Sequence, residues 1–524
     1  MIHSKTAPSG MAVTPHHLAS ESALAVLREG GDAIEAIVAA AATIAVVYPH
    51  MNGLGGDGFW LIVPPDGDPI ALDASGAAGS LANIAFYQGA EKIPHRGAKA
   101  ALTVAGTVSG WAGALALSSG KLPLSRLLAD ATGYAREGFP VTDSQAAATR
   151  SKVHELADLP GFTDLFMPDG DVPPTGSRFI QPDLADTLSQ LARHGLDSFY
   201  RGALAEKMAA EMSRLGMPIT LTDLHQHQVK RRMPLRLRHD MGDIFNTPPP
   251  TQGVVSLAIL GITNQLDMAQ ASEVQTLHRI VEATRLAFDL RDRHITDRRH
   301  MQQEAQSLLD PQRLAMMASQ IDDARAMPGA EGKGPGDTVW MGVIDKNGLA
   351  VSFIQSIYHE FGSGVVLPGT GIVWQNRGAA FSLDPTHLLA LAPGKQPFHT
   401  LNPAAARLKD GRTLVYGSMG GDGQPQTQAA IFTRYVMQGM PLQQCVTAPR
   451  WLLGRTWGES SDSLKLEGRF PQSTFDALSA LGHQLEKLPD FSEAVGHAGA
   501  IVRHASGMLE GASDPRSDGS AAGF

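Results

Sequence analysis

A long helix without a polar face is the strongest constraint on how this chain can fold. Asp32 and Glu35 have the spacing of a capping box, and apolar residues follow from position 33 to position 47. An amphipathic helix is predicted just before it, over Leu18 to Arg28. A helix that is apolar on nearly every face must be covered by protein on all sides, and this one is too short to cross a bilayer. We therefore expect it inside a thick, layered protein.

The size and composition of the chain agree with a large buried core and exclude several classes of protein. The chain has 524 residues, of which 43% are hydrophobic and 18% are charged, and its formal net charge is -9. No block of lysine and arginine is interleaved with aromatic residues, which argues against a nucleic-acid partner. Cys445 is the only cysteine, so an internal disulfide and a thiolate metal cluster are excluded. The first residues lack the apolar core of a signal peptide, and we expect a cytoplasmic protein with no membrane partner, no metal and no cofactor.

The pattern of the sequence changes abruptly at Thr338. Residues 325–337 are rich in glycine and proline and show no periodicity, which predicts an exposed loop. Two strand-like runs follow, Val339 to Ile344 and Leu349 to Ser356, on either side of an Asn-Gly turn. Counting back from this turn places Thr338 opposite residues 356 and 357 of the returning strand. The sequence thus predicts a threonine at the first position of a rigid strand, directly after a loop.

A threonine in this place has the chemistry of a nucleophile if the bond between Asp337 and Thr338 is cut. Its hydroxyl needs a base, and the new amine, with an unperturbed pKa of about 7.7–8.0, would supply one at a fixed distance. Ser356 on the paired strand could hydrogen-bond the hydroxyl or the amine. Gly420 and Gly421 could turn backbone N–H groups toward an oxyanion. Taken singly, the threonine is also typical of an ordinary strand start, and the glycines of a tight turn.

Ordered matches along nearly the whole chain resemble the gamma-glutamyltransferase family of N-terminal-nucleophile hydrolases. They include the helical segment near the start and the runs NTPPPTQG, GDTVWMGVIDKNGLAVSFIQS, FGSGVVLPGTGI and YGSMGGDGQPQT. The resemblance implies a mixed α and β fold, the four-layer αββα sandwich. It also implies autocatalytic cleavage at Asp337–Thr338 into a large subunit, residues 1–337, and a small subunit, residues 338–524, which stay intertwined.

The same resemblance implies roles for individual residues of this chain. Thr338 corresponds to the family's nucleophile, and Ser356 corresponds to its hydroxyl partner on the returning strand. Gly420 and Gly421 correspond to the glycines of the oxyanion hole.

The positions at which the chain departs from the family pattern concern the substrate. A gamma-glutamyl group ends in a zwitterion, so its site needs a cation and an acid, and these fall at Ser75 and Ala380 here. A new cation, Arg377, offers a fork that can bind a carboxylate bidentately. The family's asparagine and paired serines are also replaced. The candidate substrate-binding residues are therefore Tyr358, Asn376, Arg377, His399 and Thr400.

A site with one cation and no acid suits a monoanion that carries an amide. The segments QNRGAAFSLDP, PFHTLNP and DPRSDGSAAGF look like the oxamate amidohydrolase branch of the family, which implies attack by Thr338 on oxamate, loss of ammonia and release of oxalate. The alternatives are gamma-glutamyl transfer or hydrolysis with glutathione-type substrates, a cephalosporin-type acylase, and a scaffold that is never processed. Structurally, Arg377 could instead form an internal salt bridge, and His399 could cap a loop. The expected partners are a small amide substrate and the two subunits, with a dimer of such heterodimers as a further option.

Two further sequence patterns do not indicate a binding site. The GxGxxG pattern over residues 53–58 follows a helix and precedes a strand, which is the reverse of a dinucleotide-binding turn. A helix predicted near Leu277 to Arg291 carries charges at ion-pair spacing, and we expect that face to be exposed to solvent. Its charged residues are Glu282, Arg285, Asp289, Arg291, Asp292 and Arg293.

Overall fold

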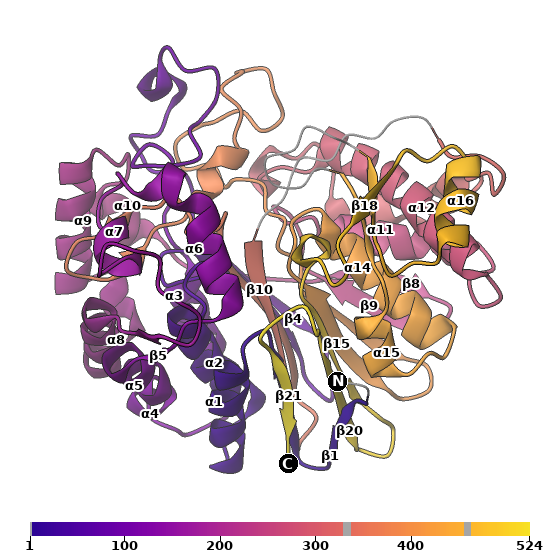
Figure 1. Ribbon diagram of the computed structural model, residues 1–524, viewed down its shortest axis with the longest axis horizontal. Coiled ribbons are helices and arrows are strands. Elements are labelled where there is room, and N and C mark those ends of the chain that lie inside the picture. The colour runs from indigo at the N-terminus through magenta and orange to yellow at the C-terminus, as the bar shows by residue number, and fades with distance from the viewer. Residues whose placement is uncertain (1–2, 328–336, 455–462) are drawn as a thin grey trace.

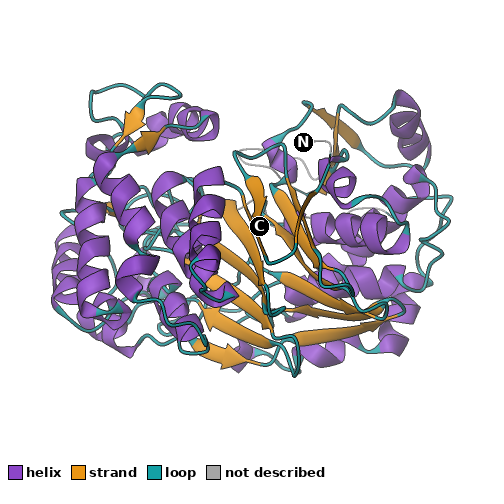
Figure 2. Ribbon diagram, turned by 90° about the horizontal axis from the view of Figure 1, so that it is seen from below, coloured by secondary structure: helices purple, strands orange, loops and turns teal. Residues whose placement is uncertain are grey.

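The fold is built from four layers. A computed structural model describes residues 3–327, 337–454 and 463–524 (Figure 1). Within these segments, two antiparallel sheets of seven strands each lie in the middle of the molecule. Helices cover the outer face of both sheets, as Figure 2 shows. The predicted αββα sandwich is confirmed.

Each sheet combines strands from both sides of the bond between Asp337 and Thr338. The first sheet has the order β21 (Ser520–Gly523), β2 (Gly10–Thr14), β10 (Asp337–Asp345), β11 (Ala350–Tyr358), β3 (Asp57–Val63), β4 (Ile70–Ala74) and β7 (Lys230–Arg232). The second has the order β1 (Lys5–Ala7), β20 (Leu509–Ser513), β19 (Ala498–Arg503), β15 (Thr413–Ser418), β14 (Ala404–Leu408), β9 (Gly242–Asn246) and β8 (Leu235–His239). The two parts of the chain are therefore interleaved within both sheets.

Helices up to residue 226 lie on the side of the first sheet, and later helices lie on the side of the second (Figure 1). The first group is α1 (His17–Arg28), α2 (Ala33–Val47), α3 (Thr107–Leu115), α4 (Leu124–Leu127), α5 (Ala129–Glu137), α6 (Asp143–Leu156), α7 (Phe162–Phe166), α8 (Pro182–His194), α9 (Ala203–Leu215) and α10 (Leu221–Gln226). The second group is α11 (Gly253–Thr263), α12 (Glu273–His294), α13 (Pro311–Ala318), α14 (Gly423–Phe432), α15 (Leu442–Thr447) and α16 (Gln472–Ala480). None of the helices in the described segments is both long and apolar enough to span a bilayer.

Short elements complete the described part of the chain. The minor sheets consist of β5 (Phe139–Pro140) with β6 (Arg178–Phe179), β12 (Val366–Leu367) with β13 (Ile372–Val373), and β16 (Trp451–Leu453) with β17 (Leu464–Glu467) and β18 (Leu485–Leu488). The 3-10 turns are η1 (Ile84–Tyr87), η2 (Leu196–Phe199), η3 (Arg298–His300), η4 (Ala305–Leu309), η5 (Arg377–Ala380) and η7 (Glu493–Val495). A π-helical turn, η6 (Thr433–Met437), continues α14.

The apolar helix lies in the interior, as the sequence predicts. Every residue of α2 is buried, and the helix packs against α1, α5 and β10. The Asp32 carboxylate accepts the backbone N–H groups of Ile34 and Glu35, and the Glu35 carboxylate accepts the backbone N–H of Asp32. This reciprocal capping box satisfies donors that burial would otherwise leave unpaired.

The predicted hairpin is formed by β10 and β11, which are neighbours in the first sheet. The register of their pairing shifts between Asp337 and Val339, so that Ser356 and Ile357 both lie opposite Thr338. Such a β-bulge, with two residues facing one, alters the direction of the side chains around it. The predicted position of Thr338 across from residues 356 and 357 is confirmed.

The expectation that the charged face of α12 is exposed is wrong for part of the helix. Glu282 and Arg291 are buried, and Arg291 forms an ion pair of 2.8 Å with Asp422, in the turn after β15. The reason is that α12 packs against α11 and α14, so these charges point into the protein. The pair of Asp289 and Arg293 is exposed, as expected.

The loop predicted over residues 325–337 lies mostly outside the described residues, although Asp337 is already part of β10. Further along the chain, α14 begins at Gly423, directly after the glycine turn.

The interior between the sheets depends on Trp340, which leads to a stability prediction. Its indole is buried, its Nε1 donates to the Ser352 hydroxyl at 2.9 Å, and a Cβ at Gly417 or Gly499 would lie 2.2 or 2.4 Å from the ring. We expect Trp340→Ala to destabilise the protein by about 3–5 kcal/mol, the usual effect of truncating a buried aromatic residue. A lower midpoint in thermal unfolding, followed by circular dichroism, would be the readout.

The matched control is Met316→Ala, because Met316 is 65% exposed on α13. We expect this variant to unfold at the temperature of the parent protein. Equal midpoints for the two variants would contradict the inter-sheet role of Trp340.

Candidate active site

Thr338 lies at the start of β10, with its hydroxyl against that of Ser356. The Thr338 Oγ1 donates to Ser356 Oγ at 3.3 Å, and both side chains are buried. The backbone N–H of Tyr358 also donates to Ser356 Oγ, at 2.8 Å. Ser356 Oγ is therefore held by the backbone of its own strand, at a fixed place beside the Thr338 hydroxyl. The pair that the sequence suggested is brought together.

Tyr358 ends β11 in a backbone conformation that is unfavourable for a bulky residue. Its φ is +80°, in the left-handed region that residues with a side chain rarely adopt. Its ring lies over the guanidinium of Arg377, with 3.7 Å between the guanidinium carbon and the ring centroid. This is a cation–π contact. The end of β11, two residues after Ser356, therefore places the Tyr358 ring against Arg377, the cation that the sequence indicated as a candidate binding residue.

Arg377 is a buried cation at the first position of η5. Its Nη1 and Nη2 each lie 3.5 Å from Thr400 Oγ1, a distance at the limit of a hydrogen bond. Burial lowers the pKa of Arg377 to about 10, and attraction to Tyr358 and Asp57 opposes this, so the group stays charged at neutral pH. Among the described residues it forms no ion pair, which is against the alternative of an internal salt bridge. A buried charge without a partner is costly, and the site is therefore suited to an anion.

Asn376 serves the protein backbone. Its Nδ2 donates to the carbonyl of His95 at 2.8 Å, and its Oδ1 accepts the backbone N–H of His359 at 3.1 Å. With both ends of the amide used in this way, Asn376 fixes the start of η5 and hence the place of Arg377. A direct contact with substrate remains a prediction from the sequence.

His399 and Thr400 bring the loop before β14 to the same place. The backbone of His399 pairs with that of Thr251, in the turn that precedes α11. Gln252, in the same turn, uses its Nε2 to donate to the Thr400 carbonyl at 2.9 Å and to the Gly421 carbonyl at 2.8 Å. One buried amide thereby joins the Arg377 side of the site to the glycine turn. Sequence reasoning missed Gln252, although NTPPPTQG was noted as a family segment.

Asp57 is a second residue that sequence reasoning missed. It opens β3 and its Cα pairs with that of Ser356, and its Oδ2 lies 3.5 Å from His399 Nε2. Burial raises the pKa of Asp57 to about 7, and burial also holds the pKa of His399 well below its usual value. The signal was present in the sequence as an acid at the head of the apolar run DGFWLIV. It was read only as part of a GxGxxG pattern.

Gly420 and Gly421 form a turn between β15 and α14 that suits an oxyanion hole. Both have positive φ, +110° and +53°, which explains why glycine is needed at these positions. The turn is closed by the Gly423 N–H, which donates to the Gly420 carbonyl at 2.7 Å. It precedes the N-terminal end of α14, where backbone N–H groups favour negative charge.

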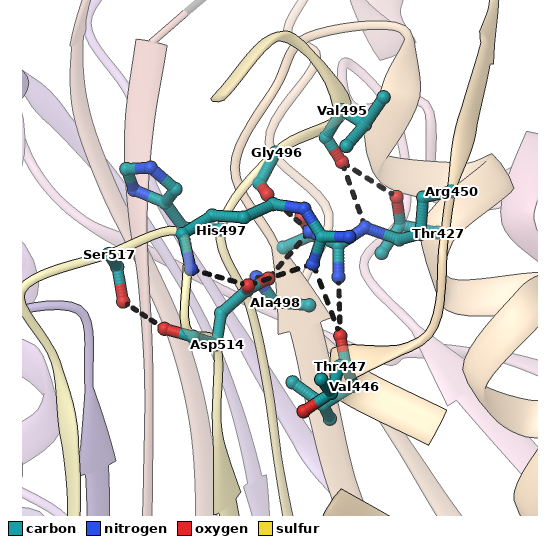
Figure 3. A network of polar contacts seen from close by, with 12 residues as sticks. Thr427, Val446, Thr447, Arg450, Val495, Gly496, His497, Ala498, Asp514 and Ser517 are labelled. Atoms are coloured by element: carbon teal, nitrogen blue, oxygen red, sulfur yellow. Dashed lines mark hydrogen bonds and ion pairs between the residues drawn. The ribbon is translucent and has the colours of Figure 1, made fainter. Parts of the chain in front are cut away.

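A buried charge network holds the segment behind this turn (Figure 3). Arg450 donates to the carbonyls of Val446 and Val495, at 2.9 and 3.1 Å, and to that of Gly496, and it pairs with Asp514 at 2.5 Å. Gly496 packs directly against the glycine turn, because a Cβ on Gly420 would lie 3.3 Å from the Gly496 Cα. The position of the glycine turn therefore depends on charges far from it in the sequence.

The two positions that should anchor a gamma-glutamyl zwitterion carry neither a cation nor an acid. Ser75 Oγ donates to Asp73 at 2.6 Å, and it accepts from Gln396 Nε2 at 2.7 Å. Ala380 ends η5 without a polar side chain. Ser75 is therefore part of an internal hydrogen-bond network.

A cluster outside this site has the composition of a metal site. His278, Glu282 and His483 are buried, and their ligand atoms lie within 4.8 Å of one another. His278 Nδ1 and His483 Nε2 share a hydrogen bond of 2.8 Å, and the Glu282 carboxylate accepts from Arg285 and from the Met327 N–H. These contacts identify the cluster as a polar link between α12 and the segment after α16. Sequence spacing did not reveal it, because His483 is remote in the chain.

Comparison with known proteins decides the family. A sequence model of the gamma-glutamyltranspeptidase family matches residues 19–524. The chain belongs to the gamma-glutamyltranspeptidase family. This confirms the resemblance seen in the sequence, and with it the expectation of an enzyme that acts on amide bonds.

Similar proteins within this family cover the chain from end to end. The chain is 69% identical to the oxamate amidohydrolase proenzyme of Klebsiella pneumoniae, with 100% of both chains covered. It is 39% identical to the glutathione hydrolase-like YwrD proenzyme of Bacillus subtilis, with 98% of each covered. The crystal structure of cephalosporin acylase from Bacillus halodurans superposes with a TM-score of 0.91 at 32% identity, covering 100% of this chain and 97% of that one. The four-layer fold is thus shared with solved members of the family.

The contact between Gly496 and the oxyanion turn yields a prediction. In Gly496→Ala the new Cβ would lie 2.3 Å from the Met419 carbonyl oxygen, so the glycine turn must move. We expect the rate of amide hydrolysis to fall by about 10²-fold, because loss of one oxyanion donor has effects of that size.

Gly482→Ala is the matched control for this variant. Gly482 also has a positive φ, +98°, but a Cβ there would meet nothing within 4 Å. Both variants bear the same backbone penalty of about 1–2 kcal/mol, and only the first displaces the turn. Equal hydrolysis rates in the two purified proteins would show that Gly496 does not support the turn.

Proposed function

We propose that this chain is a self-processing amidohydrolase that hydrolyses oxamate to oxalate and ammonia. The observation that carries this proposal is Arg377, a buried cation beside the Tyr358 ring, with no acid paired to it among the described residues. A substrate with a carboxylate next to its amide supplies the missing anion. The Klebsiella relative that is named oxamate amidohydrolase, at 69% identity, supports the same choice.

The proposed nucleophile is Thr338, freed by cleavage of the bond to Asp337. The new amine takes the proton of the Thr338 hydroxyl, and Oγ1 attacks the amide carbonyl of oxamate. Ser356 Oγ, fixed by the Tyr358 N–H, orients that hydroxyl. The amine then returns the proton to the leaving nitrogen, and ammonia departs. Water, activated by the same amine, hydrolyses the oxalyl ester and regenerates the threonine.

The glycine turn supplies the proposed oxyanion hole. The carbonyl oxygen gains negative charge during each attack, and backbone N–H groups placed in advance stabilise it in a site without bulk water. We assign this role to Gly420 and Gly421, whose positive φ angles turn the peptide groups away from the usual strand direction. Gln252 holds this turn at a fixed distance from Thr400.

The carboxylate of oxamate is proposed to bind the guanidinium fork of Arg377. The two outer nitrogens face Thr400 Oγ1 over long contacts of 3.5 Å, and a carboxylate would form shorter, charge-assisted bonds in their place. A gamma-glutamyl group would leave its ammonium without an acid at Ala380 and its carboxylate without a cation at Ser75. We therefore favour a short monoanion over a glutathione-type substrate.

Cleavage would divide the chain into residues 1–337 and 338–524, and we propose that both pieces stay in one fold. Each of the two large sheets holds strands from both pieces, so separating them would break hydrogen bonds in both. We expect the enzyme in the cytoplasm, which agrees with its single buried cysteine. A pair of processed heterodimers is a further expectation.

One test of the proposed function concerns the nucleophile. We expect Thr338→Ala to remain one full-length chain on denaturing electrophoresis, whereas the parent protein divides into two fragments at 337/338. Because the amine and the hydroxyl are both lost, hydrolysis of oxamate should fall by at least about 10³-fold, measured as ammonia release. Thr338→Ser, which keeps a hydroxyl at the same place, is the control and should still be cut.

Cleavage of the alanine variant at this bond, or oxamate turnover without cleavage, would contradict the mechanism. A parent protein that stays uncut and inactive would favour the non-catalytic scaffold.

Another test of the proposed function concerns the binding of the substrate carboxylate. We expect Arg377→Gln to be processed normally. Its kcat/KM for oxamate should fall by an amount that corresponds to about 2–5 kcal/mol of lost transition-state stabilisation, the usual effect of removing one partner of a buried charge pair. The control is Arg293→Gln, because the Arg293 side chain is 69% exposed on α12. A gamma-glutamyl anilide serves as the comparison substrate. Full oxamate activity in Arg377→Gln, or preferred turnover of the anilide by the parent protein, would overturn the substrate assignment.

A further inference from the structure

Asp57 and His399 form a buried pair beside the proposed substrate site. Asp57 is the β3 neighbour of Ser356, and His399 is the residue before Thr400. The two side chains approach through Asp57 Oδ2 and His399 Nε2, which are 3.5 Å apart. Both are almost fully buried, with 1% and 0% of their surfaces exposed. The pair therefore lies between the nucleophile and the proposed carboxylate site.

The hydrogen bonds around Asp57 are unequal. Its Oδ1 accepts the backbone N–H groups of Gly76 and Gly106, both at 3.0 Å. In the described part of the chain, Oδ2 has no hydrogen-bond partner, and neither ring nitrogen of His399 has one. Gln375 also lies against this carboxyl, and its Oε1 is unpartnered too. The atom that faces Oδ2 is His399 Nε2, which can accept a proton from an O–H group, whereas the hydrogen bond from Gln375 favours the carboxylate.

A single proton between Asp57 Oδ2 and His399 Nε2 gives each of these two atoms a partner. A protonated Asp57 can donate from Oδ2 to His399 Nε2, whose lone pair is available when the ring carries its hydrogen on Nδ1. The alternative, an imidazolium beside a carboxylate, would place a second buried cation near Arg377, and repulsion from Arg377 acts against it. The His399 Nδ1–H then stays unpaired and can donate to a ligand.

The charge of the pocket depends on that proton. The groups that face Asp57 are His399 from the loop before β14, Arg377 from η5, the Tyr200 hydroxyl after η2, and the neutral amide of Gln375. With the proton present, Arg377 gives the pocket one positive charge. Without it, the Asp57 carboxylate cancels that charge and repels a bound anion.

We propose that Asp57 and His399 share one proton that sets the charge of the substrate pocket, so that a monoanionic amide binds only when the pair is protonated. The proposal rests on the proposed function in one respect, the use of Arg377 as the carboxylate site. It adds a specificity device made of two residues that do not touch the reacting atoms. Asp57 is therefore a positioning residue, which acts on the substrate through the charge of the pocket.

The direction of the pH effect follows from the burial of the acid. Burial raises the pKa of Asp57 to about 7, so the proton is present below that pH and is lost above it. Affinity for a monoanion should be constant in the acid range and should fall by up to about tenfold per pH unit above about 7, since one proton is linked to binding. The Thr338 amine titrates nearby, at about 7.7–8.0 when unperturbed, and must be separated from this effect.

The test is the inhibition constant of isobutyrate, a monoanion of the size of oxamate without an amide to cleave. It is measured from pH 6 to pH 9 against whichever amide the processed enzyme hydrolyses. In the parent enzyme we expect the constant to rise by about tenfold per pH unit above about 7. Asp57→Asn keeps the shape of the side chain and the Thr338 amine, and its constant should vary with pH through the amine alone.

His399→Leu provides a second variant, should Asp57→Asn fail to fold. It removes the acceptor of the Asp57 O–H, which favours the ionised form, so the rise in the inhibition constant should begin at a lower pH than in the parent. A parent profile without the rise, an Asp57→Asn profile with the parent slope, or an unchanged midpoint in His399→Leu would each overturn the proposal. If oxamate is not hydrolysed but isobutyrate follows the expected profiles, the proposed substrate is wrong and the proton-sharing pair stands.

Discussion

The antiparallel pairing of β10 with β11 is the constraint on which the site depends. It fixes Thr338 at the beginning of a strand inside the first sheet, while β2 pairs with β10 only from Gly342 to Asp345 in the described segments. Among the described residues, the Thr338 end of the strand therefore pairs with β11 and not with β2. The bulge at this point presents two residues of β11 to one of β10, and this brings the Ser356 hydroxyl to Thr338. A regular ladder would place a single residue there.

The interior of the protein contains several buried arginines, and three of them have a carboxylate partner. Arg291 pairs with Asp422, and Arg450 and Arg516 both pair with Asp514. Each of these cations offsets its loss of hydration with a carboxylate. Arg377 has a tyrosine ring and a threonine hydroxyl instead, which compensate a buried charge far less. In the described segments Arg434 also lacks a carboxylate, but its guanidinium donates to the Pro449 carbonyl, whereas Arg377 has only long contacts to Thr400 and lies near the end of the strand that carries Ser356.

The features that could be predicted from the sequence are those formed by residues close together in the chain. The capping box at Asp32, the helix after it and the hairpin around Gly348 are local, and their residue types are sufficient to place them. The facing of Thr338 and Ser356 follows from counting along that hairpin. The contact of Asp57 with His399, the bridge made by Gln252 and the support of Gly496 by Arg450 join segments that are far apart, and no local pattern encodes them. The charges of α12 show the limit most clearly, because the spacing of Arg291 is that of an exposed ion pair although its partner Asp422 lies in the interior.

The carboxylate site proposed at Arg377 accounts for how a shared fold could suit a shorter substrate. At the end of β4, Ser75 is bound to Asp73 and Gln396, so that the position where the family carries an arginine has become part of the protein's own hydrogen bonding. Arg377 instead contacts the ring of Tyr358, the last residue of β11. It is connected to the glycine turn through Thr400 and Gln252. Arg377, Thr400, Gln252 and the glycine turn are thus linked by a short series of contacts. The substrate proposed for this arrangement, oxamate, has its carboxylate next to the scissile carbonyl, whereas a gamma-glutamyl group separates the two by three carbon atoms.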